Sequence, residues 1–284
     1  MKNEIFISSI AFNDRKLIEV IKICEQNNFN LEFSSSISHN RDNLKFLNEF
    51  NGEKLIHNYF PAPKEPFVIN LASKDSNILR RSISHCKENI RRTAELGLNF
   101  YAVHAGFCID PKVSSLGKKI LSDGKFDKKQ HLEIFIETLS ELLKYSNEYD
   151  VPFLIENNVL SSQNYSANNN QNIFLCTDSQ DIVYISKEIN SRRFQLLLDT
   201  GHLKVSCKTL GIDLLKETNR LFPYIGSVHH SDNDGFEDLN LPIDKYYWFS
   251  PFLKFLKPMN HVIEVKNLKP ELIINQKNIL SSGF

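Results

Sequence analysis

Short apolar runs that alternate with helical patterns are the feature of this sequence that most restricts its fold. Eight runs are rich in Ile, Val, Leu and Phe and show no polar face. They cover residues 5–11, 31–35, 67–71, 100–105, 153–156, 194–199, 225–229 and 261–265. Runs of this kind are typical of strands that are buried on both faces in a parallel sheet.

Helical patterns fill the intervals between these runs. In the clearest, Leu79, Ile83 and Cys86 recur at helical spacing, and Gly97 follows as a C-cap. The predicted helices cover residues 14–26, 77–96, 128–149, 177–189, 210–218 and 270–280. Strands that each lead into a crossover predict an α/β fold, a (β/α)8 TIM barrel, as a single domain over residues 1–284. The rival is a doubly wound sheet, whose glycine-rich loop after the first strand is absent from residues 8–12.

Charge and cysteine content narrow the expected partners and compartment. The charges of the 34 basic and 34 acidic side chains cancel, so we do not expect nucleic acid or an anionic membrane as a partner. The five cysteines form no C-x-x-C pair, so we expect free thiols in a reducing cytoplasm. We expect neither a signal peptide nor a membrane span, and the oligomeric state, with a homo-oligomer among the options, stays open.

Ionisable residues gather at or near the ends of the predicted strands. They are His57, His104, Glu156, Asp199, His202, His229 and Glu264. In a TIM barrel the active site lies at the C-terminal ends of the strands. One such histidine alone is more often a hydrogen-bonded structural residue, but several carboxylates buried around one barrel mouth would cost several kcal/mol each without a cation. The set therefore predicts a divalent-metal site.

The ligand types limit the choice of metal. Mixed His and carboxylate ligands suit Zn²⁺, Mn²⁺, Fe²⁺ or Co²⁺ better than Ca²⁺. We expect Mn²⁺, Zn²⁺, Mg²⁺ or Co²⁺ as the cofactor. Alternation along the strand points His230 away from whatever His229 faces.

The motifs around these residues resemble those of the xylose-isomerase-like TIM-barrel superfamily, which joins sugar isomerases and epimerases to the endonuclease IV branch. The resemblance extends from about the second strand to the eighth. Its segments are INLASKD at 69–75, VHAG at 103–106, IEN at 155–157, LDTGH at 198–202, VHHSDNDG at 228–235 and IEV at 263–265. Their order and their placement at strand ends carry the resemblance.

The two branches imply different ligand sets. The epimerase branch implies one metal held by Glu156, Asp199, His229 and Glu264, with Glu156 and Glu264 also acting as acid and base. The endonuclease IV branch implies three zinc ions and nine ligands. Eight of the nine match here: His57, His104, Glu156, Asp199, His202, His229, Asp238 and Glu264. Asn240 stands where the ninth, a histidine, is expected, and asparagine is a poor zinc ligand.

The resemblance favours a divalent-metal-dependent isomerase or epimerase acting on a sugar or sugar phosphate, by proton transfer through an enediolate. The alternative is an endonuclease IV-like zinc phosphodiesterase that cleaves abasic DNA. A non-catalytic sugar-binding barrel and other metal-dependent chemistry, such as dehydration, stay open. Lys204 and Lys266 could neutralise a substrate phosphate or be solvated, and Trp248 could contact a sugar or pack in the core. Residues 161–172 (SSQNYSANNNQN) are expected to form a mobile loop or a lid.

Overall fold

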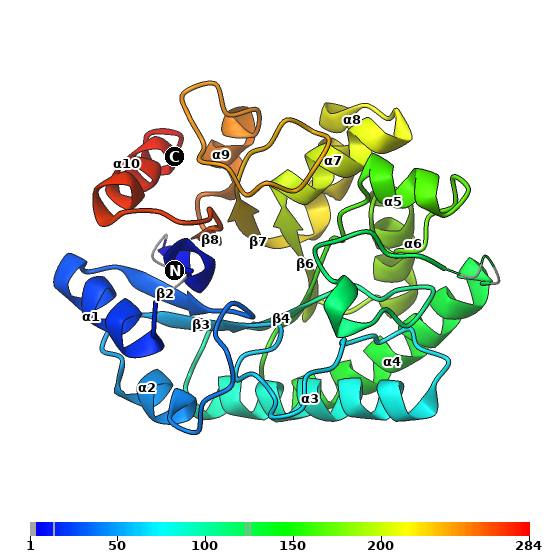
Figure 1. The fold of residues 1–284 in the computed structure, drawn as a ribbon, viewed down its shortest axis with the longest axis horizontal. Coiled ribbons are helices and arrows are strands. Elements are labelled where there is room, and N and C mark those ends of the chain that lie inside the picture. Colours follow the sequence, from blue (N-terminus) through cyan, green and yellow to red (C-terminus); the bar gives the residue numbers. More distant parts are fainter. Residues whose placement is uncertain (1–3, 14, 123, 125) are drawn as a thin grey trace.

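The computed structural model describes residues 4–13, 15–122, 124 and 126–284, and its strands close into a parallel barrel in chain order, β1 to β8. The helices surround this barrel (Figure 1). The strands are β1 (Ile5–Ser8), β2 (Asn30–Phe33), β3 (Lys54–His57), β4 (Tyr101–His104), β5 (Phe153–Glu156), β6 (Phe194–Asp199), β7 (Ile225–His230) and β8 (Asn260–Ile263). The (β/α)8 TIM barrel predicted from the sequence is confirmed.

The helices cover the outer face of the strands. They are α1 (Leu17–Asn27), α2 (Asn43–Glu49), α3 (Ser76–Glu95), α4 (Lys128–Glu148), α5 (Ser162–Ala167), α6 (Ser179–Ile189), α7 (Thr200–Leu210), α8 (Leu214–Leu221), α9 (Ser250–Leu256) and α10 (Pro270–Ser282). Helices α3, α4, α6, α7 and α8 each begin after an aspartate whose carboxylate accepts hydrogen bonds from first-turn amides. Such N-caps fix where a helix begins. None of the helices in the described ranges is long and apolar enough to cross a membrane.

Side chains alternate between the inside and the outside of the barrel. A small apolar cluster fills the interior: Phe6, Leu55, Phe100, Ala102, Leu154, Leu197 and Val262. The next residue along most of these strands, such as Ile56 or Ile155, belongs instead to the large core between strands and helices. The period of two in a strand produces this division.

A polar layer follows this apolar cluster on the side of the C-terminal ends of the strands. Five strands place a histidine or carboxylate two positions after an interior apolar residue, where alternation turns the side chain inward again. These residues are His57, His104, Glu156, Asp199 and Glu264. The apolar cluster fills the barrel on the side of the N-terminal ends of the strands, so this polar layer is reached from the C-terminal ends.

The prediction of the third strand was wrong. Residues 67–71 form a loop, and the strand is β3, Lys54–His57. Three nearby prolines, at 61, 63 and 66, lack the amide hydrogens that a ladder needs. The apolar side chains of residues 68, 69 and 71 are still buried, which explains the strand-like pattern. The correction moves His57 from a position before the third strand to the last position of that strand.

Other boundaries also differ from the sequence-based expectations. Residues 9–12 form a 3-10 helix rather than the end of the first strand. Helix α7 was not predicted from the sequence; Asp199 caps it, and His202 lies in its first turn. Residues 161–172 contain the short helix α5, and Asn164 and Asn168 bind the backbone of Ile120 and Ser122. This segment is therefore not the plain loop that its composition suggested. The predicted helix start at Asp14 lies outside the described residues.

Candidate metal centre and catalytic cavity

A cavity of about 770 Å³ opens at the C-terminal ends of the strands. Its lining includes His104, His202, Asp238 and Glu264, four of the residues singled out in the sequence. Active sites of TIM barrels lie at this end, because the β→α loops converge there. This cavity is therefore the candidate catalytic site.

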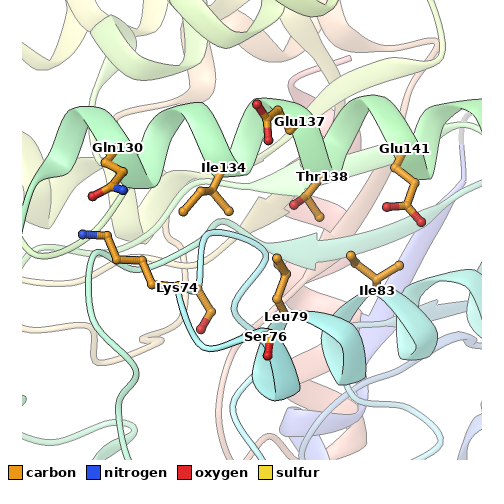
Figure 2. A pocket seen from close by; sticks show the side chains of 10 residues that line it. Lys74, Ser76, Leu79, Ile83, Gln130, Ile134, Glu137, Thr138 and Glu141 are labelled. Carbon is orange, nitrogen blue, oxygen red and sulfur yellow. The ribbon is translucent and has the colours of Figure 1, made fainter.

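A second hollow of about 480 Å³ lies outside the barrel between α3 and α4 (Figure 2). Leu79 and Ile83 of α3 point toward Ile134 of α4 across it. Its acidic residues are Glu137 and Glu141, and Glu141 is paired with Lys87 at 2.6 Å. The histidines and carboxylates of the barrel mouth do not line this hollow, so it lies outside the candidate catalytic site.

Glu156, Asp199, His229 and Glu264 meet at the floor of the large cavity. One ligand atom from each lies within 4.8 Å of the others. His229 Nδ1 is 2.7 Å from Glu264 Oε2 and 3.2 Å from Glu156 Oε1. The first three residues are fully buried, and Glu264 is partly open to the cavity. The structure thus brings together the four side chains that the epimerase branch implied as metal ligands.

Local hydrogen bonds explain why the carboxylate of Asp199 faces the cluster. Asp199 Oδ1 caps α7 by accepting a hydrogen bond from the amide of His202 at 2.7 Å. The side chain of Asn157 clamps the strand: its Oδ1 accepts from the Asp199 amide, and its Nδ2 donates to the Asp199 carbonyl. The IEN and DTGH motifs are therefore joined by hydrogen bonds, and Asp199 Oδ2 is left free to face the cluster of Glu156, His229 and Glu264.

Several buried polar atoms of the cluster have no hydrogen-bond partner among the described residues. They are both carboxylate oxygens of Glu156, Asp199 Oδ2 and His229 Nδ1. Buried polar groups are normally paired, and an unpaired buried carboxylate is costly. Converging oxygen and nitrogen lone pairs are the donor set that a divalent cation takes. The residues present therefore fit a metal ion.

The pKa shifts of these carboxyl groups also indicate a site for a cation. Burial raises the pKa of Glu156, but His104, His229 and His57 together outweigh it and hold that pKa well below its usual value. Burial likewise opposes ionisation of Glu264, but His229 lowers its pKa to about 2. Burial raises the pKa of Asp199 well above its usual value; His202 opposes the rise, and Glu264 and Glu156 add to it. Three crowded carboxylates can all be ionised only if positive charge lies among them.

Sequence analysis missed Glu32, which belongs to the same layer. Its carboxylate is fully buried, and Oε2 lies 2.9 Å from His229 Nε2. Its Oε1 has no hydrogen-bond partner within the described part of the chain. The available signal was alternation: in Asn-Leu-Glu-Phe, Leu31 and Phe33 face the outer core, so Glu32 must face inward.

A second group of candidate ligands shares Glu156 with the first. His57 Nε2 and His104 Nδ1 lie 3.0 and 3.3 Å from Glu156 Oε2. One ligand atom from each of the three residues falls within 4.8 Å of the others. His202 extends this side of the cavity, with Nε2 3.4 Å from Asp238 Oδ2. All of these residues named from the sequence gather at the same mouth.

The remaining sequence candidates divide between the cavity and other places. Asn240 and Lys266 line the cavity, and the Asn240 carbonyl accepts a hydrogen bond from the Lys266 amide. Lys204 is held instead by Asp232 and the carbonyl of Asn233, at 2.5 and 2.6 Å. This ammonium is already paired, so the structure does not favour Lys204 as a phosphate ligand.

Trp248 does not lie at the cavity, where a contact with a sugar would require it to be. It is half-buried, and its ring packs edge-on against Phe249 and Tyr247, with centroids 5.3 and 6.3 Å apart. It is not among the described residues that line the cavity. The alternative of aromatic core packing is the one that the structure supports. The alternation argument for His230 is confirmed, since this ring contacts Tyr247 and His261 on the outer side of β7.

Comparisons with known proteins agree with this architecture. The family model described as xylose isomerase-like TIM barrel matches residues 12–277. A D-tagatose 3-epimerase-like protein superposes with a TM-score of 0.74 at 20% identity, over 99% of this chain and 96% of its own. An L-ribulose 3-epimerase gives 0.63 at 13% identity, over 100% and 91% of the two chains. The IolI protein with a bound zinc atom gives 0.65 at 16%, over 99% of each. No curated protein matches the sequence.

Proposed function

The chain belongs to the xylose isomerase-like TIM barrel family, and on that premise we propose that it is a divalent-metal-dependent isomerase or epimerase of a sugar or sugar phosphate. Sugar epimerases are among the proteins that share its fold. The observation that carries the proposal is the pair of carboxylates Glu156 and Glu264. They come from β5 and from the end of β8, and they meet at His229 on one cavity floor.

In this proposal the two carboxylates are the base and the acid. Glu264 lines the cavity, and His229 lowers its pKa so that it is ionised near neutral pH, as a group that accepts the proton from the substrate carbon must be. Glu156 lies on the other side of His229 and would return a proton to the enediolate after taking that proton from His57. His57 Nε2 lies 3.0 Å from Glu156 Oε2, and despite its burial the carboxylates of Glu156 and Glu32 raise the pKa of His57. General acid–base catalysis of this kind contributes about 10²–10⁴-fold to a rate.

Glu156, Asp199, His229 and Glu264 would hold the ion. When bound, a divalent cation there supplies positive charge that polarises the carbonyl and hydroxyl oxygens of the substrate. Asp199 and Asn157 orient the site through the cap and the clamp described above. The small-molecule substrate fits the neutral overall charge, since no basic excess is present to hold a polyanion.

One observation favours the alternative, an endonuclease IV-like zinc phosphodiesterase. His57 and His104 form a second candidate group around Glu156, as a cluster of several ions would need. Asn240 disfavours this alternative, because asparagine is a poor zinc ligand and the ninth ligand, a histidine, is expected at this position. The balanced charge of 34 basic and 34 acidic residues also disfavours DNA binding.

Solvent-deuterium exchange tests the proposal. Ketoses and aldoses, with and without phosphate, are incubated with the metal-loaded protein in D₂O, and carbon-bound deuterium is measured by NMR. We expect exchange that a chelator abolishes and that the Glu264→Gln variant lacks. Cleavage of abasic-site DNA at enzymatic rates, without exchange into any sugar, would overturn the proposal in favour of the alternative.

A further inference from the structure

The charge of the catalytic cavity differs between its two sides. The loops after β7 and β8 contribute mostly negative charge to the lining: Glu237, Asp238, Glu264 and a single cation, Lys266. The loops after β2, β3 and β4 contribute Lys64 and Lys118, and none of the described lining residues on this side is a carboxylate. A cavity with opposite charges on its two sides suits a substrate that carries a charge at one end.

The floor of the cavity does not suit an anionic group. Glu156, Asp199 and Glu264 bring three carboxylates together there. A divalent ion supplies two positive charges, so the floor remains negative when an ion is bound. Burying a charged group is also costly, which favours the open rim for a strongly hydrated anion. An anionic group of the substrate is therefore directed away from the floor and toward the two lysines.

Lys64 and Lys118 are available for such a group. Both are exposed, and neither forms an ion pair with another described residue, whereas the ammonium of Lys204 is already paired. The hydroxyls of Ser35 and Ser38 line the same side, and within the described ranges no residue accepts a hydrogen bond from them. Two positive charges with hydroxyl donors suit a phosphate monoester, which carries about −1.5 to −2 charge near neutral pH and offers three acceptor oxygens.

Hydrogen bonds fix the loop after β2 on both sides of Ser35. Ser9 Oγ lies 2.8 Å from Ser34 Oγ and 2.7 Å from Ser36 Oγ. The same oxygen accepts a hydrogen bond from the amide of Ser34 at 3.0 Å. The backbone around Ser35 is thus held against the segment after β1, and the hydroxyl of Ser35 is left for a ligand.

The loops that carry the two lysines are also tied to their neighbours. The carbonyl of Ala62, two residues before the first lysine, accepts a hydrogen bond from His39 Nδ1 at 2.9 Å. Just beyond Lys118, the amide of Ile120 donates to Asn164 Oδ1 at 2.8 Å. Both lysines therefore extend from anchored backbone, and binding an anion mainly costs the conformational entropy of their side chains.

We propose that the natural substrate is a sugar phosphate whose phosphate lies at the rim against Lys64 and Lys118, while its reacting carbon lies on the floor at Glu264. This inference rests on the proposed function for the sugar end. The cavity of about 770 Å³ lies within the roughly 300–1,000 Å³ range of small-molecule sites and has room for both parts. Two lysines are few for DNA, because DNA-binding proteins make about 6–10 phosphate contacts.

Paired probes test the inference. Binding of fructose, ribulose and xylulose to the metal-loaded protein is compared by calorimetry with binding of their esters that carry phosphate on the terminal carbon. We expect at least one ester to bind at least about tenfold more tightly than its parent sugar, because a hydrogen bond to a charged group contributes about that factor. In the double variant Lys64→Gln/Lys118→Gln, the ratio of the two affinities should fall close to one.

Lys119 supplies the matched control. It follows Lys118 in the chain, is also exposed, and is not among the described residues lining the cavity, so Lys119→Gln should keep the phosphate preference. Equal affinity for ester and parent sugar, or absence of binding by every ester, overturns the inference. A phosphate preference that survives in the double variant also overturns it, because the phosphate would then be held elsewhere, as by the metal ion.

The inference and the proposed function can fail separately. Deuterium exchange into free sugars without a phosphate preference would refute this inference and leave the proposed function standing. A phosphate preference that the double variant loses, without exchange into any sugar or ester, would do the reverse. Binding of abasic-site DNA that the double variant loses, without a preference among the sugars, would assign the lysines to the alternative function and overturn the inference.

Discussion

The carboxylate of Glu32 and the imidazole of His229 form a fully buried pair, with Oε2 2.9 Å from Nε2. An imidazole that binds a metal is neutral and has one N–H, and donating it from Nε2 to Glu32 leaves the lone pair on Nδ1 for the ion. Nδ1 is the atom that lies 2.7 Å from Glu264 and 3.2 Å from Glu156. Glu32 therefore sets which nitrogen of His229 is available at the centre of the cluster.

The Glu32→Gln variant should bind the divalent ion more weakly. Glutamine keeps the shape but removes the charge that fixes the histidine tautomer, and loss of such a partner costs about 10–100-fold in metal affinity. Competition with a fluorescent chelator measures this affinity directly. Glu53→Gln, an exposed residue just before β3, is the control and should bind metal like the unaltered protein. Equal affinity of both variants would show that Glu32 does not orient His229.

Replacing either central glutamate should abolish turnover while the fold persists. Glu156→Gln and Glu264→Gln each remove one proton-transferring group, so we expect the exchange rate to fall by about 10²–10⁴-fold. Thermal unfolding and circular dichroism check that the barrel is intact. Wild-type exchange rates in either variant would mean that the carboxylate concerned moves no proton.

Metal counting on two histidine variants separates a second ion from a substrate contact. If His104 and His202 contact substrate, His104→Ala and His202→Ala should each keep the metal content of the wild type and raise KM. If they hold a second ion, elemental analysis will show fewer ions per chain. Unchanged metal content together with unchanged kinetics would contradict both roles.

Acid should destabilise the protein through His261. Burial lowers the pKa of this histidine to about 4, against an ordinary value of about 6.5. Between these values the unfolded chain binds the proton and the folded chain does not, so stability is full above about pH 6.5 and is lost as the pH falls toward 4. The loss is at most about 1.4 kcal/mol per pH unit.

Urea unfolding at pH 7.5, 6.5 and 5.5, with a chelator present, measures this dependence. The His261→Gln variant should show a shallower decline than the wild type, whatever its absolute stability. His39→Gln, at an exposed position, serves as the control and should keep the wild-type slope. Parallel slopes for all three proteins would rule out His261 as the cause.

Much of the fold followed from the sequence, because seven of the eight predicted apolar runs overlap observed strands. The third strand was not predicted because Lys54–His57 has a lysine at one end and a histidine at the other, whereas residues 67–71 are more apolar. Lys54 donates to the carbonyls of Leu47 and Phe50 at the end of α2, so its ammonium is satisfied although the residue begins a buried strand.

The site residues at the ends of β5 and β6 were predictable from the topology, whereas Glu32 was missed. Glu156 and Asp199 each stand last in a strand, so topology alone places them at the mouth. Glu32 stands inside β2, and its role depends on a contact with His229, 197 residues away in the chain. The positions of Lys204 and Trp248 likewise depend on packing partners that sequence spacing does not identify.

The central claim is that Glu156, Asp199, His229 and Glu264 hold one divalent ion. Anomalous diffraction from crystals grown with Mn²⁺, combined with elemental analysis of the same preparation, tests it most directly. The account predicts an anomalous peak bounded by these four side chains and a content of one ion per chain. A peak elsewhere, no peak at saturating Mn²⁺, or three zinc ions per chain in the purified protein would contradict it.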